Sequence, residues 1–309
     1  METQRYASNA KLRHDAWEAI LLTNIDCTLQ SVGLRLPDSQ PAEFDSISTI
    51  NKPLQTVLSE YVRRTRIPLP AFVELLRGQT SEDFRPNQNM IPDVLVRVCH
   101  GYEHLPCLLD IPAAGVQVPL SNPLPPQTTR PPNHRSALDR YNVLARRSIV
   151  VDEDVLGIWH AVHINPFGVV DKENDDPETT GRVVHDLLFP VNRSLNDCTD
   201  ADAVCEHTFE HCDAIAAELV DQQRRHPNAD VLEQAGDVSS AYRHLCIHSH
   251  CAHLFGGRLT RDNVLVVDMA AAFGWSGSPG NYGTVGSAIS FIHRHTTNTY
   301  NPSGFFSYH

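Results

Sequence analysis

Two basic side chains stand at matching places in a segment that is typical of a β-hairpin. Lys172 ends the run Phe167-Gly-Val-Val-Asp-Lys, and Arg182 opens the run Arg-Val-Val-His-Asp-Leu after an acidic loop. Two apolar runs joined by a polar loop predict paired strands. A lysine and an arginine that face each other across such a hairpin could clamp a polyphosphate, because both donate to phosphate oxygens. An ordinary surface hairpin is the alternative interpretation.

A second stretch, Gly236-Asp-Val-Ser-Ser-Ala-Tyr-Arg-His244, combines a carboxylate with an aromatic ring. We expect Asp237 at the end of an apolar strand, and Tyr242 follows five residues later. An aspartate placed in this way could hold a divalent metal beside a ring that selects a substrate by its shape. The alternative is an aspartate that caps a turn.

A third stretch, Ala272-Phe-Gly-Trp-Ser-Gly-Ser-Pro-Gly280, is a glycine-rich turn that leads into a predicted helix. Backbone N–H groups at a helix N-terminus favour anions or a nucleic-acid backbone. No Gly-Lys-Ser/Thr follows, which excludes a Walker loop. The position two after Ser276 is Ser278 rather than glycine, which excludes the nucleophile elbow of hydrolases.

In this order and spacing, the three stretches resemble the motifs of reverse transcriptases. The resemblance implies that Lys172 and Arg182 are the fingers residues that contact the incoming triphosphate. It implies that Asp237 is the first catalytic aspartate of the palm and that Tyr242 is the aromatic residue that screens the sugar 2′ position. The loop-and-helix motif that supports template and nucleotide is matched by Gly274, Trp275, Gly277, Ser278 and Pro279.

The chain is most similar in this respect to retrotransposons of the DIRS-like, tyrosine-recombinase group, and the similarity covers about residues 133–309. It implies the fingers and part of the palm of a polymerase, an antiparallel sheet with packed helices. The implied parent activity is RNA-directed DNA synthesis by nucleotidyl transfer. The implied cofactor is Mg²⁺ held by Asp237, and the implied partners are an RNA or DNA template–primer and a deoxynucleoside triphosphate.

The sequence departs from this family in its carboxylates. The family supplies two more as an Asp-Asp pair on a hairpin after the Gly-Trp-Ser-Gly-Ser-Pro helix. No Asp-Asp pair follows Asp237 here, and Asp262 and Asp268 come before the glycine-rich motif. Because two metal ions need several carboxylates at one point, we expect an incomplete Mg²⁺ site and no polymerase activity from this chain. The expectation is a polypeptide cut short before the Asp-Asp motif.

A metal-binding or nucleic-acid-interaction module without catalysis is the alternative function. The run His244-Leu-Cys-Ile-His-Ser-His-Cys-Ala-His253 holds six potential ligands, and a second group is expected on a helix, namely Cys205, His207, His211 and Cys212. Structural zinc sites prefer ligand pairs of defined spacing on turns, and only His207 and His211 meet such a spacing. A strand and a helix that are rich in histidine without metal are the other interpretation.

The elements that would position these residues follow from apolar periodicity and turn residues. We predict helices over residues 11–30, 54–78, 136–145 and 200–225, and another that Ser278 caps and Pro279 begins, ending near His295. We predict hairpins from residues 167–170 with 182–187 and from 254–258 with 264–268, and a strand that runs into a turn over 235–247. Helices and strands alternate without βαβ regularity, so the predicted fold class is α+β.

The proline-rich segment 112–132 is a predicted linker between a helical N-terminal region, residues 1–111, and the polymerase-like region, residues 133–309. The amphipathic N-terminal helices could bind a partner or simply pack in a core. The run Arg63-Arg64-x-Arg66 could contact nucleic acid, or it could be a solvated helix face.

Composition limits the classes of protein that fit. The chain has 309 residues and a formal charge of −12, which argues against coating of nucleic acid by bulk electrostatics. The acidic excess lies in residues 101–236, so a local nucleic-acid site near the C-terminal end stays compatible. No secretory leader and no membrane-spanning run is evident. Irregularly spaced cysteines in a chain of this length favour an intracellular, reducing compartment.

Overall fold

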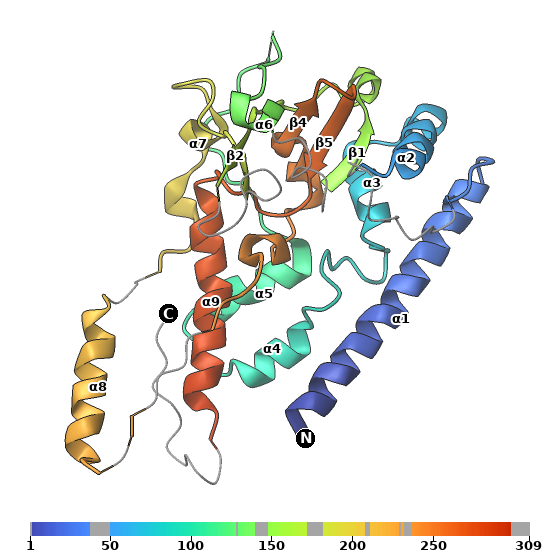
Figure 1. The fold of residues 1–309 in the computed structure, drawn as a ribbon. Coiled ribbons are helices and arrows are strands. Elements are labelled where there is room, and N and C mark those ends of the chain that lie inside the picture. The colour runs from blue at the N-terminus through green and yellow to red at the C-terminus, as the bar shows by residue number, and fades with distance from the viewer. Residues whose placement is uncertain are drawn as a thin grey trace.

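The computed structural model of the chain describes residues 2–37, 50–127, 129–139, 148–171, 182–207, 211–228, 230–231 and 236–297. These residues form a mixture of helices and strands, as the α+β prediction requires (Figure 1). The helices are α1 (Glu2–Gln30), α2 (Lys52–Thr65), α3 (Leu69–Leu76), α4 (Pro92–Val98), α5 (Leu105–Ala114), α6 (Arg135–Asp139), α7 (Leu195–Cys198), α8 (Asp213–Arg225) and α9 (Gly277–His295). The strands are β1 (Ser148–Asp152), β2 (Phe167–Val170), β3 (Arg182–His185), β4 (Gly256–Leu259) and β5 (Val264–Asp268).

The strands form two antiparallel groups. A three-stranded sheet has the order β1-β5-β4, and β2 pairs with β3 in a separate two-stranded sheet. Ser148 of β1 lies opposite Asp268, and Gly256 of β4 lies opposite Val267. In the smaller sheet Val170 lies opposite Arg182. Both predicted hairpins are therefore confirmed.

Strand β5 lies at the centre of the fold because its apolar run is buried on both faces. Leu265 and Val267 pack in the hydrophobic cluster that contains α2 and α3, whereas Val264 and Val266 pack in the cluster that contains Phe167 of β2. Side chains alternate between the two faces of a strand, so a continuous apolar run is what a doubly covered strand needs. The helical N-terminal region and the later sheet thus share one core.

The N-terminal helices α2 and α3 replace the single helix predicted over residues 54–78. Arg66 adopts a left-handed conformation with φ 56°, and Ile67 precedes a proline. A proline disfavours the α conformation of the residue before it, so the helix cannot continue through Ile67. Pro68 then serves as the N-cap of α3. The break lets residues of both helices pack in one cluster with the sheet, and the Phe72 ring of α3 lies 5.4 Å from Trp159 between centroids in a tilted arrangement.

Helix α9 starts earlier than the predicted Ser278 cap. Its N-cap is Ser276, whose side chain makes no capping hydrogen bond. Ser278 is buried and donates from Oγ to the carbonyl oxygen of Ala272 over 2.8 Å. The hydroxyl therefore fastens the preceding loop rather than capping the helix, while the end at His295 agrees with the prediction.

Two other predicted elements are wrong in part. In place of one helix over residues 200–225, the structure has a 3₁₀ turn (Ala201–Ala203), a non-helical segment at 204–207 and then α8. In place of a strand over 235–247, the described residues form a 3₁₀ turn (Ala241–His244) followed by isolated bridges. Ser240 has φ 57°, which interrupts an extended chain. The part of the predicted helix 136–145 beyond α6 lies outside the described residues.

The proline-rich segment is packed against the body of the molecule rather than spanning between two bodies. Pro112 lies inside α5, and Val116 and Val118 are buried in one cluster with Trp275. The Gln127 side chain donates to the carbonyl oxygen of Ile164 over 2.7 Å. The division at residues 112–132 stays a prediction, but this segment contributes to the core.

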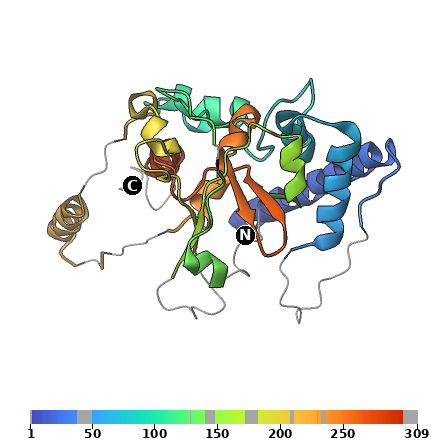
Figure 2. The same ribbon diagram turned by 90° about the horizontal axis from the view of Figure 1, so that it is seen from above.

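The long helix α1 runs along one side of the molecule, and α8 stands apart on the opposite side in both views (Figures 1 and 2). Helix α1 buries little more than Ile25 and Leu29 near its C-terminal end, and no residue of α8 is buried. None of the helices in the described part of the chain combines the length and apolarity that a bilayer crossing requires.

Candidate functional site

The loop before α9 and strand β3 meet at Gly274. The amide of His185 donates to the carbonyl oxygen of Phe273 over 2.9 Å. Gly274 has φ 114°, and a Cβ added there would overlap the carbonyl oxygen of His185. Only glycine fits both conditions. The first and third of the sequence stretches are therefore in direct backbone contact.

A buried ionic group joins the second stretch to the same place. The Asp268 carboxylate at the end of β5 accepts from Arg243 over 2.6 Å and is contacted by the Ser148 hydroxyl. Its second oxygen lies 3.3 Å from Nδ1 of His185, although the ring is not aligned for a hydrogen bond. Arg243 belongs to the second stretch and His185 to the first, so Asp268 connects them.

The protonation of this group is set by opposing effects. Burial acts against the Asp268 charge, but the Arg243 charge and the hydrogen bonds from Arg243 and Ser148 outweigh it and hold the pKa of Asp268 below its usual range. Burial lowers the pKa of His185 to about 4, so its imidazole is neutral at neutral pH. The ring stacks on Phe167 of β2 at 4.2 Å between centroids. This arrangement supports a charged Asp268–Arg243 pair beside a neutral histidine.

Tyr242 lies beside Phe273 of the third stretch, and both Tyr242 and Asp237 lie near Tyr282 of α9. The Tyr242 ring is 4.7 Å from Phe273 and 5.8 Å from Tyr282 between centroids. Burial is the main cause that raises the pKa of Tyr282, and the nearby Asp237 carboxylate adds to it. Asp237 itself is exposed. The structure thus brings an accessible carboxylate to the edge of a three-ring cluster.

The glycine-rich motif is fixed mainly by internal contacts. The Asn196 side chain donates to the carbonyl oxygen of Gly274 over 2.8 Å and accepts from the amide of Ser276 over 2.9 Å. Trp275 is buried and donates from Nε1 to the Thr199 hydroxyl over 3.2 Å. A Cβ on Gly277 would overlap the Trp275 ring. Trp275, Gly277 and Ser278 are buried and shape the loop from within, whereas Gly274, which contacts β3 on one side, and Pro279 keep exposed surface.

The triphosphate residues expected from the sequence are described only in part. Lys172 lies outside the described residues, and for Arg182 the structure describes the backbone, which pairs with Val170 in the predicted hairpin. The clamp between these two side chains stays a prediction.

The Mg²⁺ prediction rests on one exposed carboxylate. Within the described ranges, Asp237 is not in any group of three or more potential ligand side chains. Asp268 is occupied by Arg243 and His185, and Asp262 pairs with Lys52 at 3.2 Å. The donor set around Asp237 therefore does not fit a two-metal site.

Comparison with protein-family models, curated proteins and solved structures finds no match to this chain.

The sequence pattern did not identify several residues that hold the site together. Asp268 ends an apolar run, so it could have been expected at the end of a strand. Its pairing with Arg243 and His185 can be seen only in the folded structure. Asn196 and Tyr282 carry no motif signal at all. The residues that connect the stretches are thus long-range partners, which spacing along the chain does not reveal.

Proposed function

We propose that the chain is a reverse-transcriptase-like polypeptide of the retrotransposon type that binds a template–primer and a nucleoside triphosphate. The observation that carries the proposal is the convergence of the three motif stretches: β3, the Asp237–His244 turn and the Phe273–Ser278 loop meet through Arg243, Asp268 and Gly274. Three stretches singled out by their residue types thus meet at one place, as a shared nucleotide-binding site requires.

In this proposal the exposed Asp237 and the adjacent ring of Tyr242 face the nucleotide. An aromatic ring beside the sugar position can exclude a 2′-hydroxyl by its bulk, which favours deoxynucleotides. The loop before α9 supports the base pair, because its conformation is fixed by Asn196 and by the buried Trp275. Arg182 at the start of β3 contributes positive charge toward the triphosphate.

The proposal stops short of nucleotidyl transfer because the carboxylates are too few. Two Mg²⁺ ions supply charge neutralisation to that reaction, and they need several carboxylates together. The described residues offer Asp237 alone at this position. We therefore propose binding without extension, inside the cell, where the eight free thiols stay reduced.

The test is formation of a ternary complex. Binding of a labelled RNA–DNA hybrid with a chain-terminated primer is measured by fluorescence anisotropy, with and without the next complementary deoxynucleotide and Mg²⁺. The complementary nucleotide should tighten binding several-fold, and a non-complementary one should not. Arg182→Ala should abolish this increase, whereas Arg225→Ala on the outlying α8 should preserve it.

Sugar selection gives a second readout. In the Tyr242→Ala variant the complementary ribonucleotide should tighten binding as the deoxynucleotide does. Equal hybrid affinity with every nucleotide would contradict the proposed function. Primer extension with Mg²⁺ should not exceed that of an Asp237→Asn variant, and robust extension would contradict the incomplete carboxylate set.

A further inference from the structure

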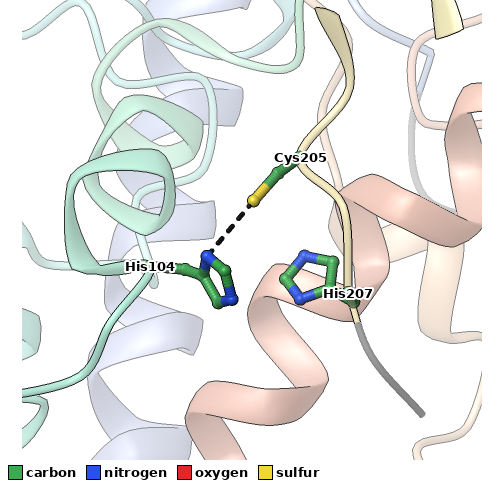
Figure 3. Close-up of side chains that lie close together, drawn as sticks. All are labelled: His104, Cys205 and His207. Carbon is green, nitrogen blue, oxygen red and sulfur yellow. Dashed lines mark hydrogen bonds between the residues drawn. The ribbon is translucent and has the colours of Figure 1, made fainter. Parts of the chain in front are cut away.

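Three metal-ligating side chains from distant parts of the sequence lie together beside α9. His104 precedes α5, and Cys205 and His207 lie on the non-helical segment that follows the 3₁₀ turn at 201–203. One ligand atom from each lies within 4.8 Å of the others. Nδ1 of His104 is 3.4 Å from Sγ of Cys205, and the two imidazole rings are 4.6 Å apart between centroids (Figure 3). All three side chains are half-buried.

The 3.4 Å separation of His104 Nδ1 from Cys205 Sγ matches a tetrahedral zinc site, and the other ligand atoms, within 4.8 Å, are close enough to converge on one ion. Zn–S bonds of about 2.3 Å and Zn–N bonds of about 2.0 Å place neighbouring ligand atoms roughly 3.5 Å apart. Imidazole and thiolate together are the donors that zinc prefers over Mg²⁺ or Ca²⁺. The half-buried position leaves an entry path for the ion from solvent.

A fourth potential ligand, Cys107, lies near this group, although it is not among the side chains whose ligand atoms all lie within 4.8 Å of one another, so its thiol would have to turn toward them to complete a tetrahedral set. Cys107 is exposed on the first turn of α5, three residues after His104. Burial raises the pKa of the Cys205 thiol most, and a hydrogen bond with the Cys107 thiol raises it further. The two thiols are thus neighbours. His104 and Cys107 are therefore a candidate ligand pair at the start of α5, and Cys205 and His207 are a candidate pair on the segment 204–207.

The surroundings hold the second pair in place. A Cβ on Gly283 of α9 would overlap the His207 ring, and one on Gly280 would overlap the Val204 side chain. The segment 204–207 therefore lies directly on the glycine face of α9. Nε2 of His207 is 2.9 Å from the Thr284 hydroxyl, a contact that orients the ring. Partners of this kind commonly strengthen metal binding by orienting the ligand.

We propose that His104, Cys107, Cys205 and His207 bind one structural zinc ion. The ion ties the start of α5 to the segment 204–207, and through it to α9. This proposal is independent of the proposed polymerase-like function. It also corrects the ligand grouping expected from the sequence, because His211 and Cys212 are exposed at the start of α8 and lie apart from Cys205 and His207.

The other His- and Cys-rich segments give weaker support for a metal site. In the run 244–253, His244 contacts the carbonyl oxygen of Ser239 and the Cys246 thiol donates to the carbonyl oxygen of Pro86. This run contributes no residue to the metal-ligand groups found among the described residues. The group of His211, Cys212 and Asp213 is fully exposed and comes from consecutive residues, so no second segment supports it.

The test is the zinc stoichiometry and affinity of the full chain purified under reducing conditions. Zinc content is measured by mass spectrometry of the metal, and affinity by competition with a chromophoric chelator. We expect one zinc per chain. Cys205→Ser and His207→Gln should each weaken zinc binding at least 100-fold, and Thr284→Val about 10-fold. The matched variants Cys212→Ser and His211→Gln should bind as the unaltered chain does.

Replacement of zinc by Co²⁺ gives a spectroscopic signal that depends on metal coordination by thiolate and not on folding alone. A thiolate-to-cobalt charge-transfer band should appear, weaken in Cys107→Ser and vanish in the Cys107→Ser/Cys205→Ser double variant. Circular dichroism of each variant with and without metal shows whether the chain is folded. A folded chain without stoichiometric zinc would overturn the proposal. So would unchanged affinity in Cys205→Ser, or a Cys107–Cys205 disulfide that persists in the reduced preparation.

Discussion

The Asp268 carboxylate is a buried charge whose partners come from separate parts of the chain. Arg243 donates to it over 2.6 Å, and His185 lies on its other side. Desolvation of such a pair costs several kcal/mol, which attraction and hydrogen bonds offset only when every partner is present. At the scale of residues, the site is therefore specified by a few polar contacts that must all form together.

The buried His185 predicts a pH dependence of stability. Its pKa is about 4 in the folded chain and about 6.5 when unfolded, so the unfolded state binds the extra proton between these values. The free energy of unfolding should then fall as the pH drops from about 6.5 toward 4. At pH 4.5 the loss of stability due to His185 is about 2 to 3 kcal/mol, and His163, which is also buried and has a pKa of about 4, acts in the same direction.

Urea denaturation at pH 7 and pH 4.5 measures this effect. In His185→Gln the difference between the two pH values should shrink, whatever the absolute stability of the variant. His226→Gln, an exposed histidine after α8, should keep the full difference. An unchanged pH difference in His185→Gln would assign the effect to other groups.

Gly274 predicts a local intolerance to side chains. A Cβ at this position would overlap a backbone carbonyl, and φ 114° is strained for any other residue. Gly274→Ala should lower the free energy of unfolding by about 2 kcal/mol or more. Gly157→Ala is the control, because a Cβ there meets no atom within 4 Å. Thermal unfolding followed by circular dichroism compares the two, and equal stability would mean that the loop can move away from β3.

At the scale of elements, β5 carries the packing between the two hydrophobic clusters. Val267→Ala should destabilise the chain by about 2 to 3 kcal/mol, because Val267 is fully buried against α2 and α3. Val170→Ala, the same truncation on an exposed position of β2, should change stability by less than about 0.5 kcal/mol. Equal effects in denaturant titrations would show that β5 is not the packing centre.

Local patterns predicted the elements whose conformation depends on nearby residues. The hairpin of β4 and β5 and most of α9 follow from apolar runs and turn residues. The helix predicted over 200–225 is interrupted because the segment 204–207 packs on Gly280 and Gly283 of α9. The break between α2 and α3 could have been found, since Pro68 and the residue before it disfavour a continuous helix.

The same distinction applies to the candidate sites. Asp237, Tyr242 and the glycine-rich loop were found from their types and spacing, and the structure brings them together. The pairing of Asp268 with Arg243 and His185 could not be found in this way. Neither could the approach of His104 to Cys205, because their separation in sequence carries no periodic signal.

At the scale of the whole molecule, the shared core predicts how fragments behave. Residues of α2 and α3 fill one face of the sheet, so a fragment of residues 112–309 would expose the apolar side chains of β1 and β5. It should not unfold cooperatively and should bind a hydrophobic dye. A fragment of residues 50–309 loses α1 and the segment that follows it, which bury Ile25 and Leu29 and pack Val32, Leu34 and Leu36 against the edge of the core, and it should keep a cooperative thermal transition at lower stability. A cooperative transition in the shorter fragment would support two independent domains.

The glycines of α9 reverse the usual preference of helices for alanine. Gly277, Gly280 and Gly283 recur every third residue, and each lies against a side chain that a methyl group would displace. Glycine in a helix interior costs about 1 kcal/mol relative to alanine, so α9 has little intrinsic helicity. An isolated peptide of residues 277–295 should therefore be largely unstructured in water. In a saturation mutagenesis screen, alanine should be rejected at these positions although it is the best helix former. Mutational data alone would then show where other residues pack against the helix.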